Sequence, residues 1–261
     1  MLGRPNPNAP RFDRWWLLVI AVISLIAYLA ITQPTPFKDM LVFVSDGLWV
    51  TIYTTVITFI LVLLFGLIGG LGRLSRNPIL RGIATIYVEV IRGIPLLVQL
   101  FFWYFAFPSI IQGLGKSWGI MAWAGYKADP TSMAILGMTF CYAAYMSEVY
   151  RAGIQSIPKG QMEAARSLGM TYFQAMRFVI IPQAIRVILP PVGNEFISML
   201  KDSSLISVVA VPDLTRRGRE FIASKFIPVE GWLLVALIYL VLTLVSARVV
   251  NYIEKRSRME K

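Results

Sequence analysis

Charged residues inside long apolar runs are the positions at which this sequence could do chemistry. Glu89 and Arg92 are three residues apart in one run, a spacing at which two side chains on a helix can form an ion pair. Lys201 and Asp202 follow Glu195 in another run, about two helical turns later. Because burying a charge in an apolar environment is costly, these residues are candidates for a binding site, a gate or a structural ion pair.

The sequence lacks the residues that most catalytic and metal-binding sites need. The sequence has no His and a single cysteine, Cys141, which excludes a disulfide framework. The same composition argues against a zinc site and against a His-based general base. No GxxxxGK[ST] phosphate-binding loop is present. We therefore expect no catalytic residue, no metal and no cofactor bound by this chain.

The composition is that of a membrane protein. Of the 261 residues, 57% are hydrophobic and 15% are charged, whereas soluble domains carry about 25% charged residues. Apolar runs of about 20 residues are typical of membrane-spanning helices. Six runs predict an all-α integral membrane protein with these spans: Trp15–Ile31, Leu41–Ile68, Ile83–Phe107, Met133–Val149, Ala184–Val211 and Trp232–Val250.

The distribution of positive charge predicts the orientation in the membrane. With six spans, both termini lie on the same side, and that side carries 16 Lys and Arg residues against 8 on the other. Because Lys and Arg concentrate in cytoplasmic loops, both termini and residues 150–183 are predicted to be cytoplasmic. The net charge of +11 then reflects topology and contact with the lipid bilayer, and no nucleic-acid partner is expected.

The predicted cytoplasmic loop does not read as an ordinary polar connection. Gln161–Leu168 contains helix-forming residues and ends at Gly169, a residue type that commonly terminates helices. Thr171 and Gln174 have the spacing of a capping box that opens a second helix, predicted to stop near Pro182. On these grounds alone, the element could dock into a soluble partner or lie on the lipid surface.

Three separated motifs resemble those of ABC importer permeases for polar amino acids. The middle motif resembles the EAA loop of that family, with Val179 and Ile181 standing where the family pattern has Ile and Leu. The outer two resemble core helices of the same permeases. In chain order the motifs are Tyr87–Gln99, then Glu163-Ala164-Ala165 with Gly169 and Val179–Pro182, then Phe196–Leu205, and the resemblance covers residues 47–256.

The resemblance implies a five-helix permease core, to which this chain adds one N-terminal helix. We expect residues 1–40 to form an N-terminal tail and the extra transmembrane helix. Residues 41–256 would form the ABC importer transmembrane domain, with a cytoplasmic coupling helix at about 160–169. Residues 257–261 would be a cytoplasmic tail. The roles of the N-terminal helix and of residues 107–131 stay open.

The resemblance also implies partners. Two permease subunits, identical or different, would form a dimer in a prokaryotic cytoplasmic (inner) membrane. Two cytoplasmic ATPase subunits would bind ATP and Mg²⁺, and an extracytoplasmic substrate-binding protein would deliver a polar amino acid. The chain itself would be a transport subunit and not an enzyme. The expected ATPase-coupling residues are Glu163, Ala164, Ala165 and Gly169. Gly169 would permit the turn, and the small side chains of Ala164 and Ala165 would permit close approach.

An amino acid needs an anion for its ammonium group and hydrogen-bond donors for its carboxylate. Pro190–Gly193 is predicted to disrupt the fifth span, and broken backbone at membrane depth is tolerated where it lines a cavity. The predicted substrate-binding residues are Asn194, Glu195, Met199, Asp202, Ser203 and Ser204, with Glu89, Arg92 and Lys201 as an intramembrane pair or gate.

Competing interpretations remain for these residues and for the function. Glu89 and Arg92 could instead position their helix, Lys201 and Asp202 could form a local ion pair, and Glu195 could bond a neighbouring helix. Two acids against one lysine in the fifth span favour a basic or neutral amino acid slightly over an acidic one. The alternative function is an ion-coupled secondary amino-acid transporter, which would need coupling-ion ligands but no docking helix.

Overall fold

The structure, a computed structural model of the chain, describes residues 15–259, which form helices and no strands. The predicted all-α membrane fold is confirmed. Residues 1–14 of the predicted N-terminal unit and residues 260–261 of the predicted tail lie outside the described range. Five stretches are long and apolar enough to cross a membrane: Trp15–Thr32, Pro34–Arg73, Leu96–Trp118, Tyr172–Val209 and Pro228–Arg256.

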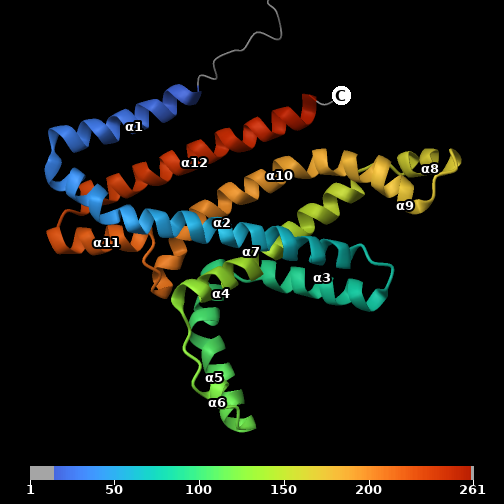
Figure 1. Cartoon of the computed structure of the whole chain (residues 1–261), viewed down its shortest axis with the longest axis horizontal. Helices are drawn as coiled ribbons and strands as arrows, with labels where there is room; N and C mark the ends of the chain where they lie inside the picture. The colour runs from blue at the N-terminus through green and yellow to red at the C-terminus, as the bar shows by residue number, and fades with distance from the viewer. Residues whose placement is uncertain (1–14, 260–261) are drawn as a thin grey trace, which may run out of the picture.

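The helices run between two ends of an elongated molecule (Figure 1). Helices α8 and α9 lie at one end and α11 at the other, while α2, α10 and α12 connect the two ends. The longer helices are α1 (Trp15–Thr32), α2 (Asp39–Arg73), α3 (Pro78–Gly93), α7 (Pro130–Gln155), α10 (Ile181–Asp202), α11 (Leu214–Lys225) and α12 (Pro228–Met259). The shorter ones are α4 (Leu96–Phe101), α5 (Phe107–Trp118), α6 (Met121–Ala124), α8 (Lys159–Ser167) and α9 (Tyr172–Ala175).

Helix α7 lies in the interior of the bundle and packs closely along α2. The two helices approach closely at Gly66, where an added Cβ would lie 2.6 Å from Cβ of Met146. Near the C-terminal end of α7, Glu148 forms ion pairs with Arg73 of α2 and with Arg151. Although α7 contains the predicted span Met133–Val149, it is not among the five apolar stretches, so the six-helix count stays a prediction.

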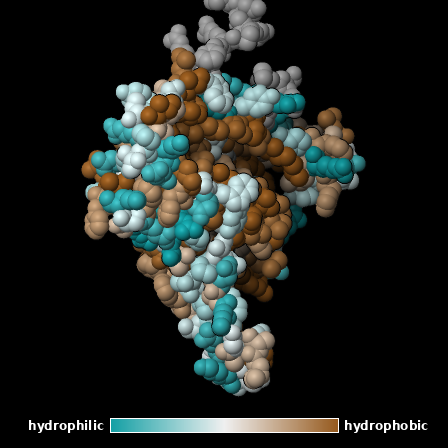
Figure 2. All heavy atoms as spheres, turned by 60° about the vertical axis from the view of Figure 1, so that its left-hand side comes forward, coloured by the Kyte–Doolittle hydropathy of each residue, from teal (hydrophilic) through white to brown (hydrophobic). Residues whose placement is uncertain are grey.

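The outer surface is largely apolar. Hydrophobic residues form broad areas on the face shown in Figure 2. Side chains such as Ile60 of α2 and Ile83 of α3 are more than half exposed. A soluble domain rarely exposes contiguous apolar patches of this kind, whereas a membrane protein buries them in lipid.

The predicted span Ile83–Phe107 is wrong as a single helix. Ile94 and Pro95 separate α3 from α4, and Ile94 is extended with φ −104° and ψ 129°. Two effects of Pro95 explain the break: proline disfavours helical geometry at the preceding residue, and it has no N–H to donate to Ile91. Helix α4 continues through a π-helical turn into α5, and the α5–α6 arm projects away from the bundle (Figure 1).

The predicted disruption at Pro190–Gly193 is also wrong, because α10 is continuous through both prolines. Each proline removes one backbone hydrogen bond and its ring crowds the carbonyl four residues earlier, but its fixed φ is compatible with a helix. Gly193 instead permits close contact with α12, since an added Cβ would lie 2.2 Å from Cγ1 of Val250. The irregular backbone comes later, in the 3₁₀ turn Ser203–Val209.

The second predicted helix of the loop does not stop at Pro182. Helix α9 runs through the π-helical turn Met176–Ile180 directly into α10. Pro182 falls in the first turn of α10, where a missing N–H is tolerated best. The loop element and the fifth apolar stretch are therefore joined by a continuous helical path.

Candidate functional site

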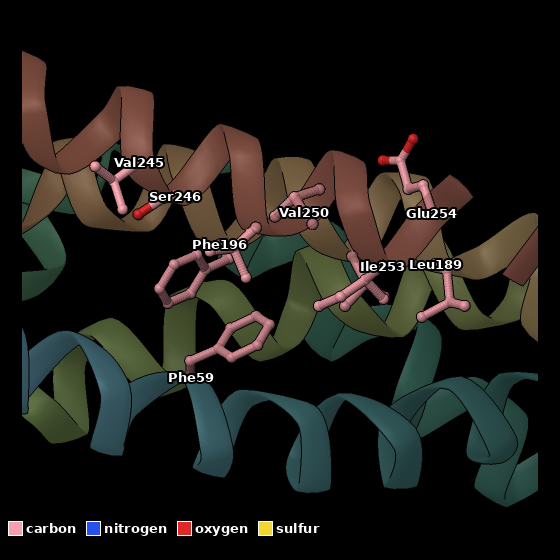
Figure 3. A pocket seen from close by; sticks show the side chains of 11 residues that line it. Phe59, Leu189, Phe196, Val245, Ser246, Val250, Ile253 and Glu254 are labelled. Atoms are coloured by element: carbon pink, nitrogen blue, oxygen red, sulfur yellow. The ribbon is translucent and has the colours of Figure 1, made fainter. Parts of the chain in front are cut away.

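A large cavity of about 490 Å³ lies between α2, α10 and α12 (Figure 3). Its lining is almost wholly apolar. Phe59 of α2 and Phe196 of α10 pack edge to face there, with ring centroids 4.9 Å apart. None of the predicted site residues lines this cavity, and the charged group on its wall, Glu254, lies at one end of it.

A second cavity, of about 440 Å³, is polar and lies where α3 breaks from α4, against α7 and α10. On α10 its residues are spaced by three and four positions, so one face of the continuous helix presents all of them. The lining residues are Arg92, Gly93, Ile94, Pro95 and Leu96 at the break, Cys141, Tyr142 and Tyr145 of α7, and Glu195, Ser198 and Asp202 of α10.

Two carboxylates and one guanidinium face this polar cavity. The hydroxyl of Tyr142 donates a hydrogen bond to Oδ2 of Asp202 at 2.7 Å, which fixes that carboxylate against α7. Within residues 15–259, no hydrogen bond or ion pair joins Glu195 to another side chain. The Glu195 carboxylate is thus available to a ligand.

Arg92 turns to the cavity and not to Glu89. Its guanidinium carbon lies 5.1 Å from the centroid of the Tyr145 ring, a cation–π contact. Glu89 is exposed on α3, and the described part of the chain shows no ion pair between the two side chains. Because α3 ends at Gly93, Arg92 is in its last turn and reaches the space opened by the break.

The structure brings together only three of the predicted intramembrane residues: Arg92, Glu195 and Asp202. Met199 is fully buried in the apolar core. The hydroxyls of Ser203 and Ser204 donate to the backbone carbonyls of Leu200 and Lys201, at 2.7 and 2.8 Å. Asn194 and Lys201 are exposed and lie outside the polar cavity.

Sequence reasoning missed three polar lining residues. Ser198 could have been found, since it lies three positions after Glu195 on the same helix. Tyr142 and Tyr145 reach the cavity only through the packing of α7 against α10, and no local pattern indicates that contact.

The predicted loop element has the expected local structure. Helix α8 is followed by Gly169 at φ +84°, a left-handed conformation that residues with a Cβ rarely adopt. The capping box is confirmed: the Thr171 N–H donates to Oε1 of Gln174 at 2.8 Å, and the Gln174 N–H donates to Oγ1 of Thr171 at 3.3 Å.

The same element presents an exposed apolar surface. Ala165 is buried at 4% exposure and anchors α8. Glu163 and Ala164 are exposed beside it. Leu168 and Phe173, at 81% and 84% exposure, project from the turn and from α9. This end of the molecule therefore carries a rigid projection with apolar side chains that the described chain leaves uncovered.

Known proteins are similar to this chain in sequence and in fold. The family described as "Binding-protein-dependent transport system inner membrane component" matches residues 62–259. The probable glutamine ABC transporter permease protein GlnP of Bacillus subtilis is 40% identical over 207 residues, which cover 77% of this chain and 88% of that protein. The arginine transport system permease protein ArgU of Corynebacterium glutamicum is 40% identical over 208 residues, covering 78% of this chain and 65% of that protein.

Solved structures agree with this relationship. A crystal structure described as "an amino acid ABC transporter with histidines" matches with a TM-score of 0.73 and 36% identity. The match covers 87% of this chain and 97% of the other.

Proposed function

We propose that a polar amino acid crosses the membrane through the polar cavity at the α3–α4 break. The premise is that the chain belongs to the family of binding-protein-dependent transport system inner membrane components. The chain is an ABC importer permease. The observation that carries the proposal is the placement of Arg92, Glu195 and Asp202 around one cavity inside an otherwise apolar bundle.

The charges of the cavity complement an amino acid. Arg92 would bind the α-carboxylate through paired N–H donors, and Glu195 would bind the α-ammonium. Asp202, held by Tyr142, then remains for the substrate side chain. One cation and two anions leave one negative charge uncompensated, which a basic side chain would neutralise. The cavity therefore favours basic and neutral amino acids over acidic ones, and the names of the glutamine and arginine relatives support this order.

The remaining partners follow from the ends of the molecule. The α8–α9 projection would dock an ATPase subunit, with Glu163, Ala164, Ala165 and Gly169 as the coupling residues. ATP and Mg²⁺ would bind to that separate subunit. A second permease subunit would complete the dimer. An extracytoplasmic binding protein would deliver the amino acid at the α11 end, with both termini cytoplasmic.

The test is the ATPase activity of the co-purified complex in nanodiscs with its binding protein. L-Arginine, L-glutamine and L-glutamate are titrated in turn. We expect arginine or glutamine to stimulate hydrolysis, and glutamate to have little effect. In Glu195→Gln, stimulation by the same amino acid should need a higher concentration. A complex without an ATPase, or one that no amino acid stimulates, would contradict the proposal.

A further inference from the structure

The break between α3 and α4 leaves backbone carbonyls without their helical donors. In a continuous helix the carbonyl of Ile91 would accept from the N–H at position 95, which Pro95 lacks. The Ile91 carbonyl keeps only a backbone bond of 3.3 Å from the N–H of Ile94, which is itself extended. The N–H of Val98, the helical donor for the Ile94 carbonyl, donates to Pro95 instead. At membrane depth no bulk water satisfies such carbonyls, and an unsatisfied one costs several kcal/mol.

One side chain satisfies both carbonyls. Nε2 of Gln99 donates to the carbonyl oxygens of Ile91 and Ile94, each at 2.9 Å. These two carbonyls lie on opposite sides of Arg92 and Gly93, so a single amide spans the break. Gln99 is the fourth residue of α4, and its backbone N–H donates to the carbonyl of Pro95 at 3.2 Å. It thereby ties the end of α3 to the start of α4.

The side-chain amide of Gln99 turns its NH₂ group, and not its oxygen, towards the two carbonyls. Its side chain is 5% exposed, and its Oε1 is buried without a partner in the described chain. Rotating the amide would point that oxygen at two carbonyl oxygens, so the donor orientation is required. Burying an amide with one unsatisfied oxygen costs free energy, which indicates that the two bonds across the break offset that cost.

We propose that Gln99 is a positioning residue that clamps the α3–α4 break and so holds Arg92 in the substrate cavity. The clamp acts through the backbone and does not touch the substrate, since Gln99 does not line the cavity. This inference rests on the proposed function of the polar cavity. When the clamp opens, the last turn of α3 is free to move, and Arg92 loses its fixed distance to Glu195 and Asp202.

Cys141 offers a reporter for the clamp. It is the sole cysteine of the chain and lines the polar cavity at 3% exposure. Its Sγ lies 3.5 Å from Nε2 of Gln99, so the thiol is in contact with the clamp. Opening the break would expose this thiol to a maleimide. Labelling of the Cys141 peptide, followed by mass spectrometry in the intact complex in nanodiscs, therefore measures opening.

The experiment compares Gln99→Met with Gln112→Met. Methionine keeps the length of the side chain and removes its donor. Gln112 is the matched control, because its Nε2 donates to the carbonyl of Tyr126 on the α5–α6 arm, away from the cavity. We expect Gln99→Met to speed labelling about tenfold, as the loss of two buried hydrogen bonds implies, and Gln112→Met to leave the rate unchanged.

Protection by substrate links the clamp to the site. L-Arginine and L-glutamine are tested as protecting ligands, and we expect Gln99→Met to raise the half-protecting concentration about tenfold. If no amino acid slows labelling of the wild-type complex, the proposed cavity is wrong whatever the variants do. If substrate protects the wild type but Gln99→Met changes neither rate nor half-protecting concentration, the clamp is wrong and the cavity stands.

Gln99→Glu keeps the proposal testable if Gln99→Met folds poorly. An ionised carboxylate cannot donate to either carbonyl, whereas a protonated one can donate to one of them. Because maleimide reacts with the thiolate, lowering the pH slows labelling of every variant, so each rate is divided by the wild-type rate at the same pH. This ratio should exceed one when the introduced carboxylate is ionised and fall towards one as the pH is lowered. A ratio of one at every pH would overturn the clamp.

Discussion

Two proline sites in the bundle have opposite effects on their helices. At Ile94–Pro95 the chain leaves the helix, while at Pro190–Pro191 helix α10 continues unchanged. The difference lies in what surrounds each site. Pro95 follows the extended Ile94, and the Gln99 side chain bridges the break, whereas Gly193 lets α10 pack closely against Val250 of α12.

The polar cavity depends both on the break at Pro95 and on the continuous helix α10. The break turns Arg92 out of the end of α3, and the continuous helix keeps Glu195, Ser198 and Asp202 on one face. A broken α10 would rotate Glu195 relative to Asp202, and an unbroken α3 would carry Arg92 along the helix surface. One irregular element and one regular element thus produce a binding surface that neither would form alone.

The largest expected effect comes from removing the charge at the break. Arg92→Gln should lower amino-acid uptake by about 100-fold, because truncating one partner of a desolvated charged contact costs about 2–5 kcal/mol. Lys201→Gln is the matched control, since Lys201 lies on the adjoining face of α10 outside the cavity. Uptake is measured in proteoliposomes with the full complex. If Arg92→Gln and Lys201→Gln lost uptake equally, the placement of Arg92 in the cavity at the break would not explain its effect.

Exchanging the prolines themselves tests the comparison next. Pro95→Ala restores an N–H that can bond Ile91 and straighten the helix, so we expect uptake to fall about fivefold, the worth of one hydrogen bond. Pro190→Ala only completes a helix that is already continuous, and uptake should change by less than about twofold. If Pro190→Ala proved the more damaging variant, the contrast between the two sites would be reversed.

A third helix end, at Gly169, should affect coupling and leave the cavity intact. Gly169→Val places a β-branched residue at φ +84°, which costs about 1–2 kcal/mol, while Gly169→Asn is better tolerated there. We expect Gly169→Val to insert normally and to lose most of the amino-acid stimulation of ATP hydrolysis. Gly169→Asn should retain most of it. Comparable stimulation in Gly169→Val and the wild type would remove Gly169 from the coupling residues.

The sequence predicted the apolar stretches, the α8–α9 element and its capping box, because each depends on composition or on residues a few positions apart. It was wrong about the disruption at Pro190–Gly193, where α10 is continuous. The close contact that follows the two prolines involves a residue distant in sequence, Val250 of α12, which no local pattern of α10 indicates. Helical spacing from Glu195 correctly reached Asp202, but it also reached Met199, which faces the core.

Charge type was a better guide to the cavity than neighbourhood in the chain. Arg92 lies on α3, whereas Glu195 and Asp202 lie on α10, and only tertiary packing brings Arg92 to the two acids. Ser203 and Ser204 adjoin Asp202 in sequence, yet their hydroxyls bond their own helix. Small hydroxyl side chains find backbone partners locally, so proximity to a charged site residue does not predict that they face the ligand.

The smallest expected effect is on stability, at the α11 end. Asp213 is fully buried and accepts from the N–H groups of Thr215 and Arg216 at 3.1 and 3.0 Å. Burial nevertheless raises its pKa from 3.8 to about 6. Because the folded protein then holds this proton more tightly than the unfolded chain, stability falls as pH rises from about 4 to about 6.

Asp213→Asn should flatten that pH dependence while keeping the helix cap, since Asn is also a good N-cap residue. We expect the melting temperature of the wild-type complex to drop by about 5 °C over this range and that of the variant to change little. Parallel melting curves for the two proteins would show that Asp213 has an ordinary pKa.

The most direct test is a structure of the complex in nanodiscs, determined by electron cryomicroscopy with and without L-arginine. The account predicts amino-acid density in the cavity at the α3–α4 break, with the carboxylate at Arg92 and the ammonium at Glu195, in a chain whose α10 stays continuous. Arginine bound elsewhere in a well-resolved map, with the cavity closed by protein side chains, would contradict it.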